Sequence, residues 1–223
     1  MMKKLFLTLF VVAICSISFA QIDAEQFALD VSKADAANTE KLKAYIWKRH
    51  ATATVKGEVK ATVVNEVSFD ENGKIQVTNV DATTTAKNKR GIRGRIQDNA
   101  MESNMDYVNN ALQLSLTYTY MSKGQLLDFF DKSTITEKDG TVEIAGVNVY
   151  MQGDSLTVIV DSATKLFINK KFSSMLDEDP ISGVIKYEKF SSGIMHGSET
   201  IMNLPGKNAV INAKNQDYSE RIQ

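Results

Sequence analysis

A serine that could act as a nucleophile, Ser155, lies in the segment GDSL at residues 153–156. This tetrapeptide is the signature of a large group of serine esterases, in which a later Asp-x-x-His supplies the base that activates the serine. The chain has two histidines, His50 and His196, and the residue three positions before His196 is Gly193. The Asp-x-x-His pair is therefore missing. A Gly-Asp pair is typical of a tight turn between strands, and we expect no enzymatic activity and no catalytic residue.

The same residue types provide no metal or cofactor site. Neither histidine belongs to an HExxH pattern, and two distant histidines without cysteines form a weak ligand set. The carboxylates Asp177 and Asp179 stand in a segment typical of a turn, where solvation is the default state of such a pair. A glycosidase would need two carboxylates that flank a substrate. We expect no metal, no cofactor and no glycoside hydrolysis.

The amino-terminal segment predicts export. Lys3 and Lys4 precede a continuous apolar run at residues 5–17, which is shorter than the roughly 20 residues that a membrane-spanning helix needs. Small residues follow this run, as a signal peptidase requires. We expect a signal peptide at residues 1–20, cleavage near Ala20–Gln21, and a periplasmic or secreted mature protein.

The single cysteine, Cys15, lies inside this apolar run. A lipid-attachment cysteine follows a small residue, whereas Ile14 precedes this one, so lipidation is the weaker alternative. Removal of the signal leaves no cysteine, which excludes disulfides and thiol catalysis in the mature chain. Loss of Lys3 and Lys4 also changes the formal charge from −1 to −3. This weakly acidic balance argues against nucleic acid as a partner.

The remaining residues, 21–223, are expected to form one domain. Helical spacing of apolar residues predicts a helix over 35–49, with His50 at its end. Strands are expected from residue 52 onward, and the Asn72-Gly73 and Asp139-Gly140 pairs predict hairpin turns. Short turns separate the later strands, which indicates an antiparallel meander. These strands are expected at 142–151, 156–160, 165–172, 181–190, 199–204 and 209–213.

The segment from Ile96 to Met121 fits two periodicities. Its first half has helical spacing, whereas its second half alternates as a strand would. Ser122 and Gln125 form a capping box that predicts a further short helix. We therefore expect a helical insert at about 96–132. Its Met, Tyr, Leu and Phe side chains could belong to the core or line a ligand pocket, because Met adapts its shape readily. The candidate pocket residues are Met101, Met105, Leu112, Leu116, Tyr120, Leu127 and Phe130.

A cluster of positive charge precedes this insert. A solvated loop is one interpretation of such a cluster. The other is a contact with an anionic head group or a membrane surface, since a flexible, positively charged backbone can wrap phosphates. The cluster consists of Lys87, Lys89, Arg90, Arg93 and Arg95.

Several short motifs lie along the mature chain: Asn38, Leu42, Tyr45, Trp47, residues 56–60, Asp70, residues 72–74, Gly153, Asp154, Ala213, Asn215 and Tyr218. These motifs resemble those of a family of exported bacterial proteins without assigned function. The order of elements also resembles the periplasmic lipoprotein-carrier superfamily, whose strongly curved antiparallel sheet forms an open half-barrel. The resemblance implies an α+β fold, with an N-terminal helix and a helical insert packed on the concave face. It also implies a cavity that binds acyl chains.

The function expected from these observations is non-catalytic binding in the periplasm. The ligand would be an acyl chain or another hydrophobic molecule held between sheet and helices, because burial of each methylene group is favourable by about 0.8 kcal/mol. A lipid or the acyl chain of a lipoprotein is the expected partner, with peripheral membrane contact through the basic cluster. The alternative is a cell-envelope interaction or scaffold protein without a small ligand. The sequence names no protein partner.

Overall fold

A computed structural model describes the protein over residues 23–84, 92–190 and 193–221. For residues 92–103 the description covers the backbone alone. The signal peptide expected at 1–20 and its cleavage point lie outside the described residues.

The described chain forms three α-helices, one short 3-10 turn and ten strands. The helices are α1 (Ala24–Leu42), α2 (Ile92–Thr119) and α3 (Lys123–Asp131), and the 3-10 turn is Pro205–Lys207. The strands are β1 (Tyr45–Val55), β2 (Glu58–Phe69), β3 (Ile75–Thr84), β4 (Thr134–Lys138), β5 (Thr141–Val147), β6 (Ser155–Asp161), β7 (Phe167–Leu176), β8 (Asp179–Lys189), β9 (Met195–Leu204) and β10 (Ala209–Glu220).

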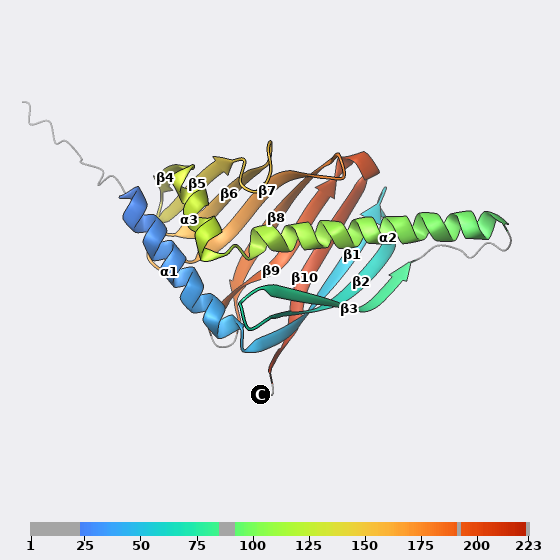
Figure 1. Cartoon of the computed structure of the whole chain (residues 1–223), viewed down its shortest axis with the longest axis horizontal. Helices are drawn as coiled ribbons and strands as arrows, with labels where there is room; N and C mark the ends of the chain where they lie inside the picture. The colour runs from blue at the N-terminus through green and yellow to red at the C-terminus, as the bar shows by residue number, and fades with distance from the viewer. Residues whose placement is uncertain (1–22, 85–91, 191–192, 222–223) are drawn as a thin grey trace, which may run out of the picture.

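All ten strands belong to one open antiparallel sheet (Figure 1), in the order β3-β2-β1-β10-β9-β8-β7-β6-β5-β4. Neighbours in the sheet are also neighbours in the sequence, except where β1 pairs with β10. The sheet therefore consists of two meanders, β1–β3 and β4–β10, joined along one seam. Strands β3 and β4 are its two edges.

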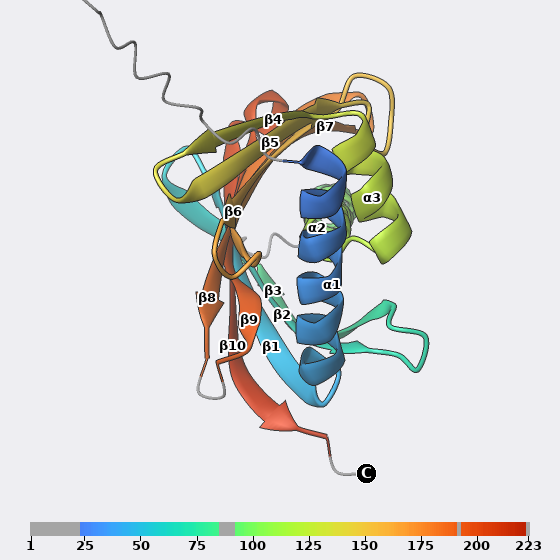
Figure 2. The same ribbon diagram turned by 90° about the vertical axis from the view of Figure 1, so that its left-hand side faces the viewer.

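The three helices lie on the same face of the curved sheet (Figure 2). In Figure 1, α2 crosses this face and its N-terminal half extends past the strands. The α+β fold class predicted from the sequence is confirmed. No helix in the described part of the chain is both long enough and apolar enough to cross a membrane.

The main core fills the space between the helices and this face. It includes Val31 on α1, Phe129 on α3, Ile144 on β5 and Ile185 on β8, each at most 4% exposed. A second, smaller cluster of side chains surrounds Trp47 near the end of α1. Because both clusters join helix to sheet, the helices are held at defined positions above the strands.

Helix α1 differs from the helix predicted at 35–49. It begins at Ala24, where the Asp23 side chain caps it, and it ends at Leu42. The residues from Tyr45 onward form β1, a central strand that pairs with both β2 and β10, and His50 therefore lies in a strand. Sheet pairing on both sides outweighs the helical spacing of this segment, which is rich in aromatic and β-branched residues.

Both predicted hairpin turns are present, and each has its glycine at a positive φ. Gly73 and Gly140 have φ values of +77° and +78°, a region that only glycine adopts without strain. In the first turn, the Asp70 carboxylate also accepts hydrogen bonds from the backbone N–H of Asn72 and Lys74. The predicted helix within 96–121 is also confirmed, because it lies within α2.

One predicted strand ends earlier than expected. Its expected range was 142–151, whereas β5 stops at Val147, and residues 148–154 form a loop. Asn148 takes a positive φ of 57°, which turns the chain away from the sheet. Alternation of apolar residues does not reveal this break, because Val149 and Met151 continue the apolar pattern.

Candidate functional site

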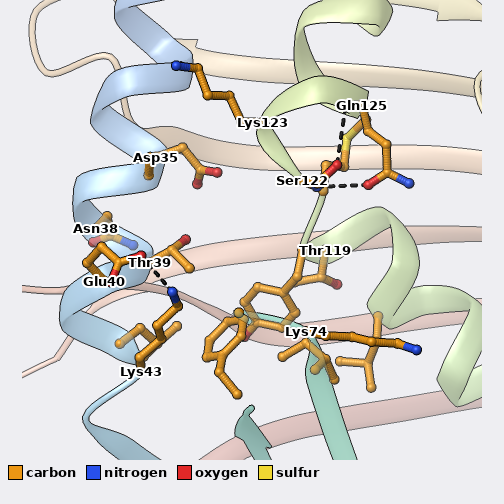
Figure 3. Close-up of a pocket in the computed structure, with 18 of the residues that line it drawn as sticks. Asp35, Asn38, Thr39, Glu40, Lys43, Lys74, Thr119, Ser122, Lys123 and Gln125 are labelled. Atoms are coloured by element: carbon orange, nitrogen blue, oxygen red, sulfur yellow. Dashed lines mark hydrogen bonds and ion pairs between the residues drawn. The ribbon is translucent and has the colours of Figure 1, made fainter. Parts of the chain in front are cut away.

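A cleft of about 580 Å³ opens between the helices and the first meander (Figure 3). Its walls are the C-terminal half of α1, the end of α2 with its connection to α3, and the β2–β3 turn. The apolar lining consists of Ala36, Leu42, Phe69, Ile75, Leu116, Tyr120, Met121, Tyr187 and Met195. The other lining residues are Ser32, Asp35, Asn38, Thr39, Glu40, Lys43, Asn72, Gly73, Lys74, Gln113, Thr117, Thr119, Ser122, Lys123 and Gln125.

About two turns of α1 carry the polar wall of this cleft. Ser32, Asp35 and Thr39 follow the spacing that places residues on one helix face. The helix is attached to the sheet by Asn38, whose amide donates to the Met195 carbonyl and accepts from the Met195 N–H, at 2.7 and 2.8 Å. This pair of hydrogen bonds fixes the distance between α1 and β9 at the cleft.

Aromatic rings form the opposite wall. The Tyr120 ring lies 5.4 Å from that of Phe69 and 6.1 Å from that of Trp47, between centroids. Trp47 is fully buried and stacks on Tyr218 of β10. A ligand in the cleft would therefore touch a ring cluster that extends into the sheet.

A buried arginine of the sheet is hydrogen-bonded to the C-terminal part of α2. Arg49 on β1 is 1% exposed, and its guanidinium donates to the Leu112 carbonyl at 3.2 Å and to Ser115 Oγ at 2.7 Å. Burial lowers the pKa of Arg49 from 12.5 to about 10. The Tyr150 hydroxyl donates to the Thr117 carbonyl near the same helix end.

A buried lysine completes this attachment. Lys170 on β7 is fully buried, and its ammonium donates to the carbonyls of Tyr118 and Thr119 at 3.1 and 2.9 Å. It also lies over the rings of Phe167 and Tyr187, at 4.1 and 5.5 Å from their centroids. Positive charge suits the carboxyl end of a helix, where carbonyls lack partners. Burial nevertheless lowers the pKa of Lys170 from 10.5 to about 8.

The carboxyl group of Asp35 is the acidic group inside the cleft. Burial raises its pKa, and the positive charge of Lys170 acts in the opposite direction. Figure 3 shows this side chain extending from α1 toward the connection between α2 and α3. Two further polar atoms belong to residues of the cleft wall, Ser32 Oγ and Tyr120 Oη, and both are buried without a hydrogen-bond partner among the described residues.

The GDSL segment has a structural role in a loop. Asp154 is 1% exposed, and its carboxylate accepts four hydrogen bonds at the end of the 148–154 loop. The donors are the Tyr118 hydroxyl and the backbone N–H groups of Val149, Tyr150 and Met151. Asp154 therefore folds the loop and attaches it to α2.

The serine and the histidines of the sequence analysis lie on separate strands. Ser155 begins β6 and His196 lies on β9, with β7 and β8 between them, a separation of about 14 Å at the usual strand spacing. His196 Nδ1 shares a hydrogen bond with the Tyr218 hydroxyl, and burial lowers the pKa of this histidine. His50 Nε2 lies 3.6 Å from Asp217. In the described ranges, no three His, Cys, Asp or Glu side chains gather as metal ligands.

The candidate pocket residues divide between the cleft and the core. Leu116 and Tyr120 line the cleft. Leu112 and Phe130 belong to the buried core, and Met105 and Leu127 pack against it. The side chain of Met101 lies outside the described residues.

The residues of the basic cluster are described in part or not at all. Lys87, Lys89 and Arg90 lie outside the described residues, and Arg93 and Arg95 are described only as backbone positions at the start of α2.

Sequence reasoning missed Ser32 and Asp35, which build the cleft wall on α1, and it named Asn38 only as a motif residue and not as part of a site. It also missed the buried Arg49 and Lys170. A signal for the two cations was available, because each stands in phase with buried apolar residues of its strand.

Comparisons with known proteins found similar folds among solved structures. No model of a known protein family matches the sequence, and no curated protein matches it. The chain is similar to a DUF1329 family protein from Desulfovibrio piger, with 10% identity, a TM-score of 0.43, and coverage of 89% of this chain and 92% of the other. It is also similar to a LolA superfamily protein from Nitrosomonas europaea, with 9% identity, a TM-score of 0.38, and coverage of 91% and 96%.

A third similar structure, from Vibrio parahaemolyticus, is described as an outer membrane lipoprotein-sorting protein domain. It has 8% identity and a TM-score of 0.43, with coverage of 88% of this chain and 93% of the other.

Proposed function

We propose that this protein is a non-catalytic binding protein of the bacterial envelope, which holds one long-chain hydrophobic ligand in the cleft between α1, the end of α2 and the β2–β3 turn. The observation that carries the proposal is the cleft itself. Its volume of about 580 Å³ lies within the range of roughly 300–1,000 Å³ that small-molecule sites occupy.

The lining of the cleft supports an amphipathic ligand. Ala36, Ile75 and Tyr120 provide apolar surface that remains accessible in the cleft, and an acyl chain that covers it gains about 0.8 kcal/mol for each buried methylene. Polar side chains of α1 and α3 surround this surface. A molecule with one apolar chain and one polar end matches both parts of the lining.

The proposed location is the periplasm, reached through the export signal of the first 20 residues. The lysines of the basic cluster, such as Lys87, would bring the protein to anionic membrane surfaces, where its ligand is exchanged. Binding without catalysis is supported by Asp154, whose carboxylate is engaged by three backbone N–H groups and the Tyr118 hydroxyl.

Native mass spectrometry tests this proposal. The full chain, produced with its own leader and purified from the envelope, is expected to carry a bound mass that organic extraction removes and identifies as a lipid. A cleft-filling variant, Ala36→Trp, should lower ligand occupancy at least tenfold. Ala37→Trp is its matched control, because Ala37 is also exposed on α1 but does not line the cleft. Equal occupancy in both variants, or a protein that takes up no lipid, would contradict the proposal.

A scaffold role is the second candidate, and the edge strand β3 favours it. Most β3 residues are exposed, including Val80 at 55%, and an edge strand offers unpaired backbone groups to an added strand of another protein. A photoactivatable residue at Val80 that captures one partner reproducibly, in a protein without bound lipid, would support this role instead.

A further inference from the structure

Two polar atoms of the cleft wall, Ser32 Oγ and Tyr120 Oη, are buried without a hydrogen-bond partner among the described residues. The half-buried carboxylate of Asp35 beside them also forms no hydrogen bond with a described residue. Ser32 is only 1% exposed. Buried polar groups in folded proteins nearly always have partners, so unpartnered ones beside a cleft indicate that a ligand completes them.

These groups face the cleft from two sides. Ser32 and Asp35 are three residues apart on α1 and share one helix face. Tyr120 directly follows α2, and its ring packs against Phe69 on the opposite wall. Together they offer a carboxylate acceptor, a phenol donor and a hydroxyl that does both. A ligand group that donates and accepts would satisfy all three.

The charges in this region decide which ligand group fits. Lys170 is the buried charge that acts on Asp35, but its ammonium donates to two backbone carbonyls and forms no ion pair with Asp35 among the described residues. The interior around Asp35 thus holds one carboxylate and two cations, Lys170 and Arg49, and the donors of both cations are engaged by α2. A second carboxylate would be repelled by Asp35 and a second ammonium by Lys170, and burial of an unpaired charge is costly.

We propose, building on the function above, that Ser32, Asp35 and Tyr120 recognise the polar end of the bound ligand, and that this end is an uncharged hydroxyl-bearing group, as in a monoacylglycerol. The exposed Lys74 and Lys123 and the Glu40–Lys43 ion pair remain at the mouth of the cleft. The apolar chain lies on Ala36 and Ile75, whose side chains remain accessible in the cleft.

A comparison of three probes with the same chain length tests this assignment. Monopalmitoylglycerol, palmitic acid and hexadecylamine are titrated into extracted full-length protein, and the fluorescence of the single tryptophan, which packs against Tyr120, reports binding. The glyceride is expected to bind at least tenfold more tightly than either charged probe. Ser32→Ala and Tyr120→Phe should each weaken glyceride binding about tenfold, since each removes one partner of the head group.

Asp35→Asn should have the opposite signature, because it removes the carboxylate and leaves the buried cations Lys170 and Arg49. Palmitate affinity is expected to rise at least tenfold in this variant. Glu25→Gln is the matched control, a carboxyl-to-amide change at an exposed position on the same helix that does not line the cleft, and it should change no affinity more than twofold. Unfolding curves verify that each variant folds. If Asp35→Asn does not fold, the Tyr120→Phe variant still tests the head-group assignment.

The outcomes separate the two proposals. Equal affinity for the three probes, unchanged in the variants, would overturn head-group recognition while leaving a chain-binding cleft. Failure of all three probes to bind would overturn both proposals.

Discussion

Charged side chains inside this protein serve as attachments between elements. Arg49 and Lys170 donate to the last turns of α2, and Asp154 accepts from the loop that precedes β6. Asp35 is the exception, since no described residue hydrogen-bonds with it. At the scale of the residue, the first three groups are expected to control stability and the fourth to control binding.

Replacement of Asp154 should destabilise the fold. Asp154→Asn places an amide NH₂ or a single oxygen where a carboxylate accepts four hydrogen bonds, and we expect a loss of about 2–3 kcal/mol in the free energy of unfolding. Urea denaturation measures this loss. Ser155→Ala is the adjacent control and should stay within about 0.5 kcal/mol. Equal stability of the two variants would show that the carboxylate does not hold the loop.

Lys170 makes stability depend on pH in the alkaline range. Burial lowers its pKa from 10.5 to about 8, so between these values the unfolded chain binds a proton that the folded protein does not. The free energy of unfolding should therefore rise as pH increases from 8 toward 10.5. Lys170→Met should lack this rise, and the difference between wild type and variant at pH 7.5 and 9.5 measures it by urea denaturation. Parallel pH profiles for the two proteins would contradict the assignment.

The buried cations could have been predicted from the phase of their strands. Arg49 stands between Trp47 and Ala51, and Lys170 stands two residues before Phe172, so both point to the apolar face. Charged residues are nearly always exposed, and because of this general expectation their phase with the buried residues was not interpreted as burial. Ser32 and Asp35 could not have been found in this way, because the other walls of the cleft that they line come from distant segments.

Helix α1 depends on tertiary contacts for its position. Asn38 makes the pair of hydrogen bonds that attaches this helix to Met195 on β9. The same helix forms one wall of the cleft. At the scale of the element, a weaker attachment of α1 should therefore alter the shape of the cleft more than the pairing of the strands.

Asn38→Ala is expected to reduce the free energy of unfolding by about 2 kcal/mol, because two partly buried hydrogen bonds are lost and Met195 keeps unpartnered backbone groups. Hydrogen exchange should also increase in α1 more than in β9. Lys33→Ala, an exposed change on the same helix, provides the reference. Identical exchange in the two variants would show that other contacts position the helix.

Local turn chemistry made the hairpins predictable, while the helix ends were less so. The Asn72-Gly73 and Asp139-Gly140 pairs determine their turns through the φ of glycine, whatever surrounds them. The segment after Leu42 has apolar residues that fit both a helix and a strand. Pairing with β2 and β10 decides it, and a single sequence does not reveal that pairing.

At the scale of the whole molecule, one seam unites the two meanders. It pairs β1 with β10 from Tyr45–Glu220 to Val55–Ala209. The ring stack of Trp47 on Tyr218 crosses the same seam. The second core cluster, which forms part of the cleft wall, therefore exists only when the seam is closed.

A charge placed in the seam should separate the meanders. Ala213 is 1% exposed and pairs with Ala51, so Ala213→Glu is expected to cost more than about 3 kcal/mol. Val210→Glu is the control, since Val210 lies on the same strand and is 40% exposed. Tryptophan fluorescence during denaturation reports opening of the seam, because Trp47 stacks on Tyr218 across it. Equal unfolding midpoints for the two variants would show that the seam tolerates a buried charge.

The seam also orders events in time. Strand β1 is synthesised before every other described strand and β10 after all of them. Hairpins between chain neighbours can form locally, whereas the β1–β10 pair must close a very long loop, which is slow. Until then, the backbone groups along one side of β1 remain open to pairing with another chain. The period before the last strand joins, and not the folded state, is when this protein is most exposed to aggregation.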